Sequence, residues 1–306
     1  MNIHPINFQT APGEAPAILP PARDSIFSKR AERFTRLAEG HALGEWLRFL
    51  ARLSSAQDAA LCALPPPALP DADTLAQARA HGMPPLNVSA TARPESWRAV
   101  LRQLLAAVET DAPESARPRL QSLAAASDEE LEALADALLR EDAEAADAGR
   151  LTFVAAALQV VWTALAASLD GSTLQKLDPP GVCPCCGSLP VGSIVRLGDA
   201  VNNLRYLHCS LCNTEWNIPR AVCTSCGTDQ GVAYQELAGE AVRAPAAVRA
   251  ETCDHCHSYL KMCLQDKDPL VDPVADDLAT LPLDLLVDEA GYERSGPNLF
   301  LLGGAA

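Results

Sequence analysis

The sequence of 306 residues is poor in aromatic and in basic residues. Phe, Trp and Tyr make up 5% of the chain, whereas Ala and Leu, which favour helices, are abundant. Lys and Arg number 24 against 39 Asp and Glu, which gives a formal net charge of −15, and no segment concentrates the basic residues. Because this charge repels phosphate backbones and anionic membrane surfaces, nucleic acid is not the expected partner.

Motifs for export, membrane insertion and catalysis are also absent. The N-terminus has no basic segment followed by an apolar one, so we expect no signal peptide. The longest apolar run, Phe153–Leu169, is interrupted by polar residues and is short for a bilayer span, so we expect no membrane insertion. No phosphate-binding loop, dinucleotide fingerprint or nucleophile motif occurs. These absences predict a cytoplasmic protein that is not an enzyme.

The N-terminal half has the pattern of an all-α bundle. Apolar residues recur at helical spacing, and Gly40, Pro65–Pro67 and Asp170–Gly171 separate the helical segments. Ser127 and Glu130 have the spacing of a capping box at the start of one helix. The expected helices cover residues 26–38, 43–64, 72–80, 94–105, 127–139 and 151–169.

From residue 177 the pattern changes to short β-branched runs between Pro, Gly and Cys. Val191–Val195 and Arg205–His208 predict short strands. Leu283–Asp288 predicts a helix that starts at Pro282 and has Leu285 and Leu286 facing inward. The apolar tail over residues 296–302 is expected to pack on the protein surface.

These patterns predict an α+β fold in five parts. A flexible leader (1–20) precedes an N-terminal all-α helical bundle (21–176). Two small rubredoxin-like or zinc-ribbon metal modules follow (177–216 and 217–265). An acidic C-terminal helix and tail (266–306) complete the chain.

Eight of the eleven cysteines form four Cys-x-x-Cys pairs. The pairs are Cys183/Cys186, Cys209/Cys212, Cys223/Cys226 and Cys253/Cys256. A Cys-x-x-Cys turn places two sulfurs on one side of a loop, and two such turns complete a tetrahedral four-thiolate site. The sequence therefore predicts two metal sites with four cysteines each.

The gaps between the pairs suggest how they combine. The first and second pairs are separated by 22 residues and the third and fourth by 26, whereas only 10 residues separate the second from the third. A loop of the longer kind can form a hairpin, so we predict sequential pairing, with a cross-braced arrangement as the alternative. Gly187 and Gly227 each follow a pair, where glycine permits a positive φ.

The identity of the metal stays open at this level. Four thiolates suit zinc and iron equally, and zinc would be structural whereas iron would add one-electron chemistry. Cys185, inside the first pair, is either a spectator or a reactive thiol. Cys62, on an Ala- and Leu-rich helix face, and Cys263 are both expected to be buried.

Histidines and aromatic residues flank the cysteine pairs. His208, His255 and His257 could replace a thiol, but each pair already supplies two sulfurs, so we expect supporting or surface positions. Tyr206, Trp216 and Tyr259 are expected to form a small core or a protein-binding face rather than a surface for stacking bases.

Several of these segments resemble the formate dehydrogenase accessory protein FdhE family. The resembling segments are Cys183–Ser188, Arg205–Trp216, Val222–Gly227, Glu251–Lys261, Asp276–Leu286, Gly291–Tyr292 and Gly296–Phe300. Phe27–Phe34 and His41–Phe49 are similar too, with weaker motifs. The resemblance extends over nearly the whole chain.

The resemblance implies a cytoplasmic maturation factor that is needed to make active formate dehydrogenase without being part of it. It implies contact with the catalytic subunit of that enzyme before the subunit is exported. It also implies that the eight paired cysteines hold two metal ions, with iron as the family's metal. The oligomeric state is not indicated.

Two alternatives remain at the sequence level. A rubredoxin-like protein could pass electrons to the client or reduce its thiols during maturation. A nucleic-acid-binding zinc ribbon fits the cysteines, but from Gly181 onward the chain has 8 Lys and Arg against 16 Asp and Glu. Hydrolytic metal catalysis is disfavoured because four-thiolate sites leave no open coordination position.

Overall fold

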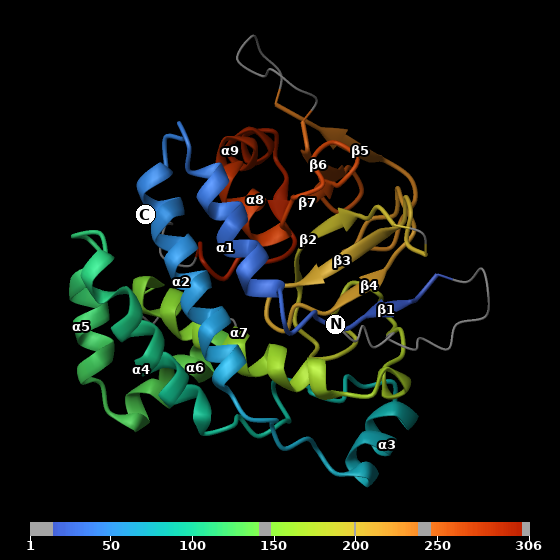
Figure 1. Ribbon diagram of the computed structural model, residues 1–306. Coiled ribbons are helices and arrows are strands. Elements are labelled where there is room, and N and C mark those ends of the chain that lie inside the picture. Colours follow the sequence, from blue (N-terminus) through green and yellow to red (C-terminus); the bar gives the residue numbers. More distant parts are fainter. Residues whose placement is uncertain (1–14, 141–147, 199, 238–245, 302–306) are drawn as a thin grey trace, which may run out of the picture.

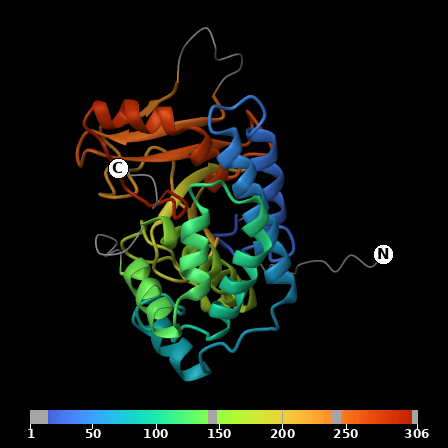
Figure 2. The same cartoon turned by 90° about the vertical axis from the view of Figure 1, so that its left-hand side faces the viewer.

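The computed structural model describes residues 15–140, 148–198, 200–237 and 246–301. Over these ranges the chain forms nine α-helices and a mixed sheet of eight strands, which confirms the predicted α+β class. Figure 1 shows α2 and α4 to α6 at the left, the sheet at the right, α8 and α9 beside α1 near the top, and α3 at the lower right. In Figure 2, α1 and α2 run along one edge and connect the bundle to the C-terminal elements.

The helices agree well with the sequence pattern. They are α1 (Ile26–Leu37), α2 (Gly44–Ala63), α3 (Ala72–Ala80), α4 (Ser96–Val108), α5 (Arg117–Ala125), α6 (Asp128–Leu139), α7 (Ala148–Ser168), α8 (Pro273–Ala279) and α9 (Leu281–Glu289). The sequence prediction missed α5 and α8. The start of α8 does carry a signal, because the Asp272 side chain caps the helix and Pro273 follows at its first position.

Helix α7 lies at the centre of the bundle and contacts α2, α4, α5 and α6. Apolar side chains cover its whole circumference, since neighbouring elements bury it on every side. By length and composition its segment Gly149–Ser168 could cross a membrane, and 89% of the apolar window is buried inside the protein. The expectation that this segment is too short to span a bilayer was therefore too strict. Its burial, however, is that of a core helix.

The strands form one continuous sheet. They are β1 (Ile18–Leu19), β2 (Pro190–Val195), β3 (Arg205–Cys209), β4 (Glu215–Asn217), β5 (Val232–Gln235), β6 (Val248–Cys253), β7 (Ser258–Leu264) and β8 (Glu293–Arg294). The order is β1-β4-β3-β2-β7-β6-β5, and β8 also pairs with β7. The parallel pair β2–β7 joins the two segments predicted as metal modules. The boundaries assigned to these modules stay a prediction.

The ends of the predicted leader and tail are ordered parts of the fold. Ile18 and Leu19, from the segment expected to be flexible, pair with Trp216 and Glu215 of β4, whereas residues 1–14 lie outside the described ranges. In the tail, Phe300 is 2% exposed, which confirms that residues 296–301 pack against the protein.

Alternate residues of the central strands face different cores. Leu207 and Leu260 belong to the large core of the bundle, whereas their neighbours Tyr206 and Tyr259 belong to a second core under α9. Successive strand residues point to opposite faces, so the sheet is covered on both sides.

Two predictions of burial were wrong because of helical geometry. Cys62 is exposed, since Ala60 and Leu61 take the inward positions at this end of α2. In α9, Leu283 and Val287 are buried one turn apart, and Leu285 and Leu286 between them face away. Leu285 and Leu286 are accordingly 66% and 53% exposed, not inward-facing.

Buried ion pairs connect α1 to the segment around α8. The Arg33 guanidinium donates to both carboxylate oxygens of Asp276 at 2.6 and 2.8 Å and to Asp268 at 2.6 Å. Arg30, which is fully buried, pairs with Asp272 at 3.2 Å. The N-terminal helix is thereby fastened to a segment more than two hundred residues away in the sequence.

We predict that Arg33→Met lowers the free energy of unfolding by about 3–5 kcal/mol, because Asp276 would keep a buried charge without its partner. Arg36→Met is the matched control on the same helix. Arg36 pairs with Glu32 in solvent, with side chains 54% and 58% exposed, so its loss should cost at most about 0.5 kcal/mol. Urea unfolding of both variants tests this, and equal small losses would contradict it.

Candidate metal centres

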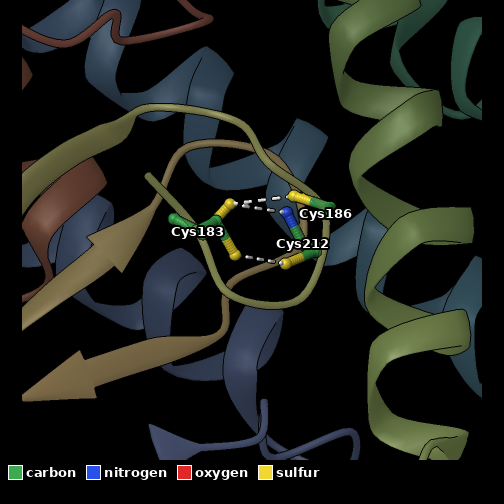
Figure 3. Close-up of side chains that lie close together, drawn as sticks. Cys183, Cys186 and Cys212 are labelled. Atoms are coloured by element: carbon green, nitrogen blue, oxygen red, sulfur yellow. Dashed lines mark hydrogen bonds between the residues drawn. The ribbon is translucent and has the colours of Figure 1, made fainter. Parts of the chain in front are cut away.

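The structure brings the first two cysteine pairs into one buried group. The sulfur atoms of Cys183, Cys186, Cys209 and Cys212 all lie within 4.8 Å of one another, and each of the four residues is 0% exposed. Figure 3 shows the labelled Cys183, Cys186 and Cys212 pointing towards one another from two loops. We call this set the first cysteine group.

The other two pairs form a second cysteine group. Cys223, Cys226, Cys253 and Cys256 also have their sulfurs within 4.8 Å of one another. The predicted sequential combination of the pairs is thus the one adopted, and the cross-braced alternative is not.

The sulfur spacing fits a tetrahedral ion. Within the first group, Cys183 Sγ lies 3.5 Å from Cys212 Sγ, and Cys186 Sγ lies 3.5 Å from Cys209 Sγ. The corresponding distances in the second group are 3.6 and 3.8 Å. Metal–sulfur bonds of about 2.3 Å place tetrahedral sulfurs about 3.8 Å apart, whereas a disulfide needs about 2.05 Å. Both groups therefore have the geometry of metal sites and not of disulfides.

Each of the four pairs closes a turn of the same shape. The residue after the second cysteine has a positive φ in every pair: Gly187 (+83°), Asn213 (+58°), Gly227 (+73°) and His257 (+54°). The sequence pointed to the two glycines alone. Because Asn and His tolerate this conformation better than most residues, the other two turns need no glycine.

Hydrogen bonds repeat from turn to turn. The first cysteine of three pairs accepts a hydrogen bond at its carbonyl oxygen from the residue with positive φ, as in Gly187 N to Cys183 O at 2.9 Å. The amides of Leu211 and Cys212 both donate to Cys209 Sγ at 3.4 Å. Such bonds stabilise a thiolate and fix its direction.

The electrostatics of the first group suit a cation. Burial raises the pKa of Cys183 and of Cys209 well above the usual range. Although burial opposes it, hydrogen bonds from the neighbouring thiols hold the pKa of Cys212 well below that range. A lone buried thiolate among thiols is one stable state, but four thiolates need a positive ion in their centre. The donor set therefore suits a metal ion.

The first group is enclosed by the helical bundle. Leu86 N donates to Cys185 O at 2.9 Å, and Val88 N donates to Cys186 O at 3.1 Å. From α7, Gln159 donates to Ser210 O at 2.7 Å. The loop before α4 and the central helix therefore hold both turns of this group.

Asn213 connects the second turn of the first group to two helices. Its Nδ2 donates to Thr163 Oγ1 on α7 at 2.8 Å, and its Oδ1 accepts from Arg30 Nη2 on α1 at 2.8 Å. A glycine at this position would adopt the positive φ equally well, but both side-chain hydrogen bonds would be lost.

The second group lies at the surface. Cys223 and Cys253 are 4% and 2% exposed, whereas Cys226 and Cys256 are exposed to solvent. Ser258 supports the group, because its hydroxyl lies 3.1 Å from Cys256 Sγ. Although burial opposes it, hydrogen bonds from Ser258 and from the neighbouring thiols lower the pKa of Cys256 to about 7.

Neither Cys185 nor Cys263 belongs to a group. Cys185 is fully buried, and contact with Cys212, together with burial, raises its pKa well above the usual range. Such a thiol is unreactive, which favours the spectator interpretation. Cys263 is 2% exposed, so its predicted burial is confirmed.

The flanking histidines lie outside both groups. His255 and His257 are exposed, whereas His208 is buried, with Nδ1 2.9 Å from Glu215 Oε1 and Nε2 3.1 Å from Asn213 Oδ1. No sequence pattern had pointed to Glu215 as the partner of His208. Although burial opposes it, the charge of Arg196 and the hydrogen bond with His208 lower the pKa of Glu215 to about 2.

The flanking aromatic residues are internal. Tyr206, Trp216 and Tyr259 are 0%, 2% and 4% exposed, and Trp216 donates to Pro180 O at 2.7 Å. All three are core residues and not a binding face: Tyr206 and Tyr259 lie in the second core, whereas Trp216 lies in the large core and not in the small one that was expected.

A broad apolar groove adjoins the first group. Its volume is about 740 Å³, and its walls are the proline-rich segment after α2, α3, the loop before α4, and Val161 and Leu165 of α7. The loop before α4 lines the groove with Pro84 and Asn87 and also contacts the turn at Gly187. No sequence pattern had indicated this groove.

Family models match most of the chain. The model "FdhE, N-terminal" matches residues 15–178, "FdhE, central domain" matches 182–220, and "FdhE, C-terminal domain" matches 221–301. The central match contains the first cysteine group, and the C-terminal match contains the second.

Curated relatives and a solved structure agree with these matches. The chain is 43% identical over 291 residues to "Protein FdhE homolog" of Edwardsiella ictaluri, covering 95% of this chain and 92% of the relative. It is 38% identical over 291 residues to "Protein FdhE" of Escherichia coli, covering 94% and 92%. The crystal structure of the FdhE protein from Pseudomonas aeruginosa matches with a TM-score of 0.84 at 38% identity, covering 95% of this chain and 100% of that chain.

The two glycine turns offer a matched pair of substitutions. Both Gly187→Ala and Gly227→Ala place a side chain at a positive φ, which costs about 1–2 kcal/mol. At Gly187 the new Cβ would also lie 3.2 Å from Pro84 Cγ, whereas at Gly227 it would meet nothing within 4 Å. We expect the first variant to be the less stable in thermal and urea unfolding. A larger loss for Gly227→Ala would contradict the enclosed position of the first group.

Proposed function

Because this chain belongs to the FdhE family, we propose that it is a cytoplasmic accessory protein for the maturation of formate dehydrogenase. In this role it binds the catalytic subunit before export and is not part of the final enzyme. The observation that carries the proposal is the family match over 95% of the chain together with two four-cysteine groups on one continuous sheet.

The proposed cofactors are two metal ions. One would be held by Cys183, Cys186, Cys209 and Cys212, and the other by Cys223, Cys226, Cys253 and Cys256. Iron is the proposed metal, and zinc satisfies the same donor set. Either ion, when bound, supplies the positive charge that four thiolates need, and iron adds a one-electron couple. The chain's own part is to fix the sulfurs by the repeated turns and their hydrogen bonds.

The proposed client surface is the apolar groove beside the first group. The aromatic side chains beside the cysteines cannot present a binding face, because all three are buried. The groove is open, is lined mainly by proline and aliphatic side chains, and is large enough for a short extended segment. We propose that it holds an apolar segment of the formate dehydrogenase catalytic subunit.

A non-enzymatic role is supported by the saturation of both groups. Four thiolates fill a tetrahedral ion, which leaves no position for a substrate. The second candidate function, electron transfer to the client during maturation, is favoured by the surface position of the second group. A nucleic-acid-binding role is opposed by the charge of −15, and tight, salt-sensitive binding in a gel-shift assay would be needed to revive it.

Metal analysis of protein purified without oxygen tests the cofactors. We expect two ions per chain, with the iron–thiolate absorption bands of a rubredoxin-like site. Zinc alone, without those bands, would leave the accessory role in place but would end the electron-transfer alternative.

A pull-down with the formate dehydrogenase catalytic subunit tests the client surface. Met83 lines the groove and is 49% exposed. We expect Met83→Asp to weaken binding at least about tenfold, because it removes an apolar contact and introduces a charge. Metal content and unfolding should stay unchanged.

The control for this experiment is Leu285→Asp. Leu285 is 66% exposed on α9 and does not line the groove, so binding should persist. Loss of binding with Leu285→Asp and retention with Met83→Asp would place the client on α9 and overturn the groove assignment.

A further inference from the structure

The two cysteine groups share one coordination geometry but differ in their access to solvent. All four cysteines of the first group are 0% exposed and belong to the large core. In the second group, Cys226 and Cys256 are exposed, as are the adjoining Asp254, His255 and His257. The difference therefore lies in the surroundings and not in the ligands.

The packing around the two groups explains the difference. The first group is covered by α7 and by the loop before α4, with hydrogen bonds from Leu86, Val88 and Gln159 to its turns. The hydrogen bonds described around the second group include bonds from neighbouring turns and from β8. Ser225 and Ser258 bond to each other at 3.1 Å, and Glu293 N donates to His257 O at 2.7 Å. No described helix covers Cys226 or Cys256.

This difference controls how an ion could leave. Exchange requires an incoming donor to reach the ion, form a bond to it and displace one thiolate, which then takes a proton from water. At an exposed thiolate this step needs no opening of the fold. At a buried group, a local unfolding event must come first, and its free energy approaches that of global unfolding in the core.

We propose that the second cysteine group is an exchangeable metal site that can pass its ion to external thiolate, imidazole or carboxylate donors, whereas the first group holds its ion permanently. The inference rests on the proposed binding of two ions. It assigns the structural role to the first group and the exchange with partners to the second.

The test is a chelator challenge of the full chain carrying two Zn²⁺ ions. EDTA is added, samples are desalted at intervals, and zinc is measured by mass spectrometry. We expect one ion per chain to leave quickly and the other at least about 100-fold more slowly, because the first group must open before it reacts. Equal rates for the two ions would overturn the inference, and fewer than two ions at the start would overturn the metal proposal as well.

Cysteine alkylation identifies which ion has left. After the fast phase, iodoacetamide should label the exposed Cys226 and Cys256 but not the first group. Cys62, exposed and distant from both groups in sequence, provides an internal reference for a free thiol. Labelling of the first group in the fast phase would overturn the assignment.

A variant provides an independent check. Cys226→Ser should bind a single ion, and that ion should show only the slow exchange. Its first group should keep its fold, because Cys226 lies at the surface and outside the large core. Rapid loss of the single remaining ion would overturn the proposal.

Discussion

Four cysteines buried in the main core constrain the rest of this structure. Sulfur atoms within 4.8 Å of one another, without solvent and without a lysine or arginine among their described contacts, need an ion to become thiolates. Their turns are held by α7, by the loop before α4 and, through Asn213, by α1. The group therefore joins the helical bundle to the sheet, and loss of its geometry would disturb both.

The same region concentrates charge in the interior. Arg30 pairs with Asp272 and also donates to Asn213, which follows the second cysteine pair. Further along the sheet, Lys261 is 1% exposed and donates to Asp277 O at 2.8 Å, and Arg294 pairs with the Asp277 carboxylate at 2.9 Å. Buried pairs of this kind add little stability in themselves, but they penalise any arrangement that separates the partners. They thus fix the position of the C-terminal segment relative to α1 and β7.

Much of the local structure could be predicted because local rules decide it. Helical spacing identified α2, α3, α6 and α7 to within a few residues, and the glycines at 187 and 227 marked two of the four turns. The remaining turns use Asn213 and His257, for which no sequence rule is specific. Burial was predicted less well, since Cys62 and Leu285 lie on outward faces that a pattern of apolar residues alone does not distinguish.

The sequence by itself determined the class of the fold and the four repeated cysteine pairs, because these depend on spacing along the chain, and it favoured the sequential combination that the structure then showed. Only the tertiary structure decided that the pairs share one sheet through β2 and β7, and that one group is enclosed while the other is open. The four identical Cys-x-x-Cys spacings do not indicate which other segments of the chain will pack over each cysteine group. That depends on contacts between segments as distant as Leu86 and Cys185, and it is these contacts that make two similar sites physically different.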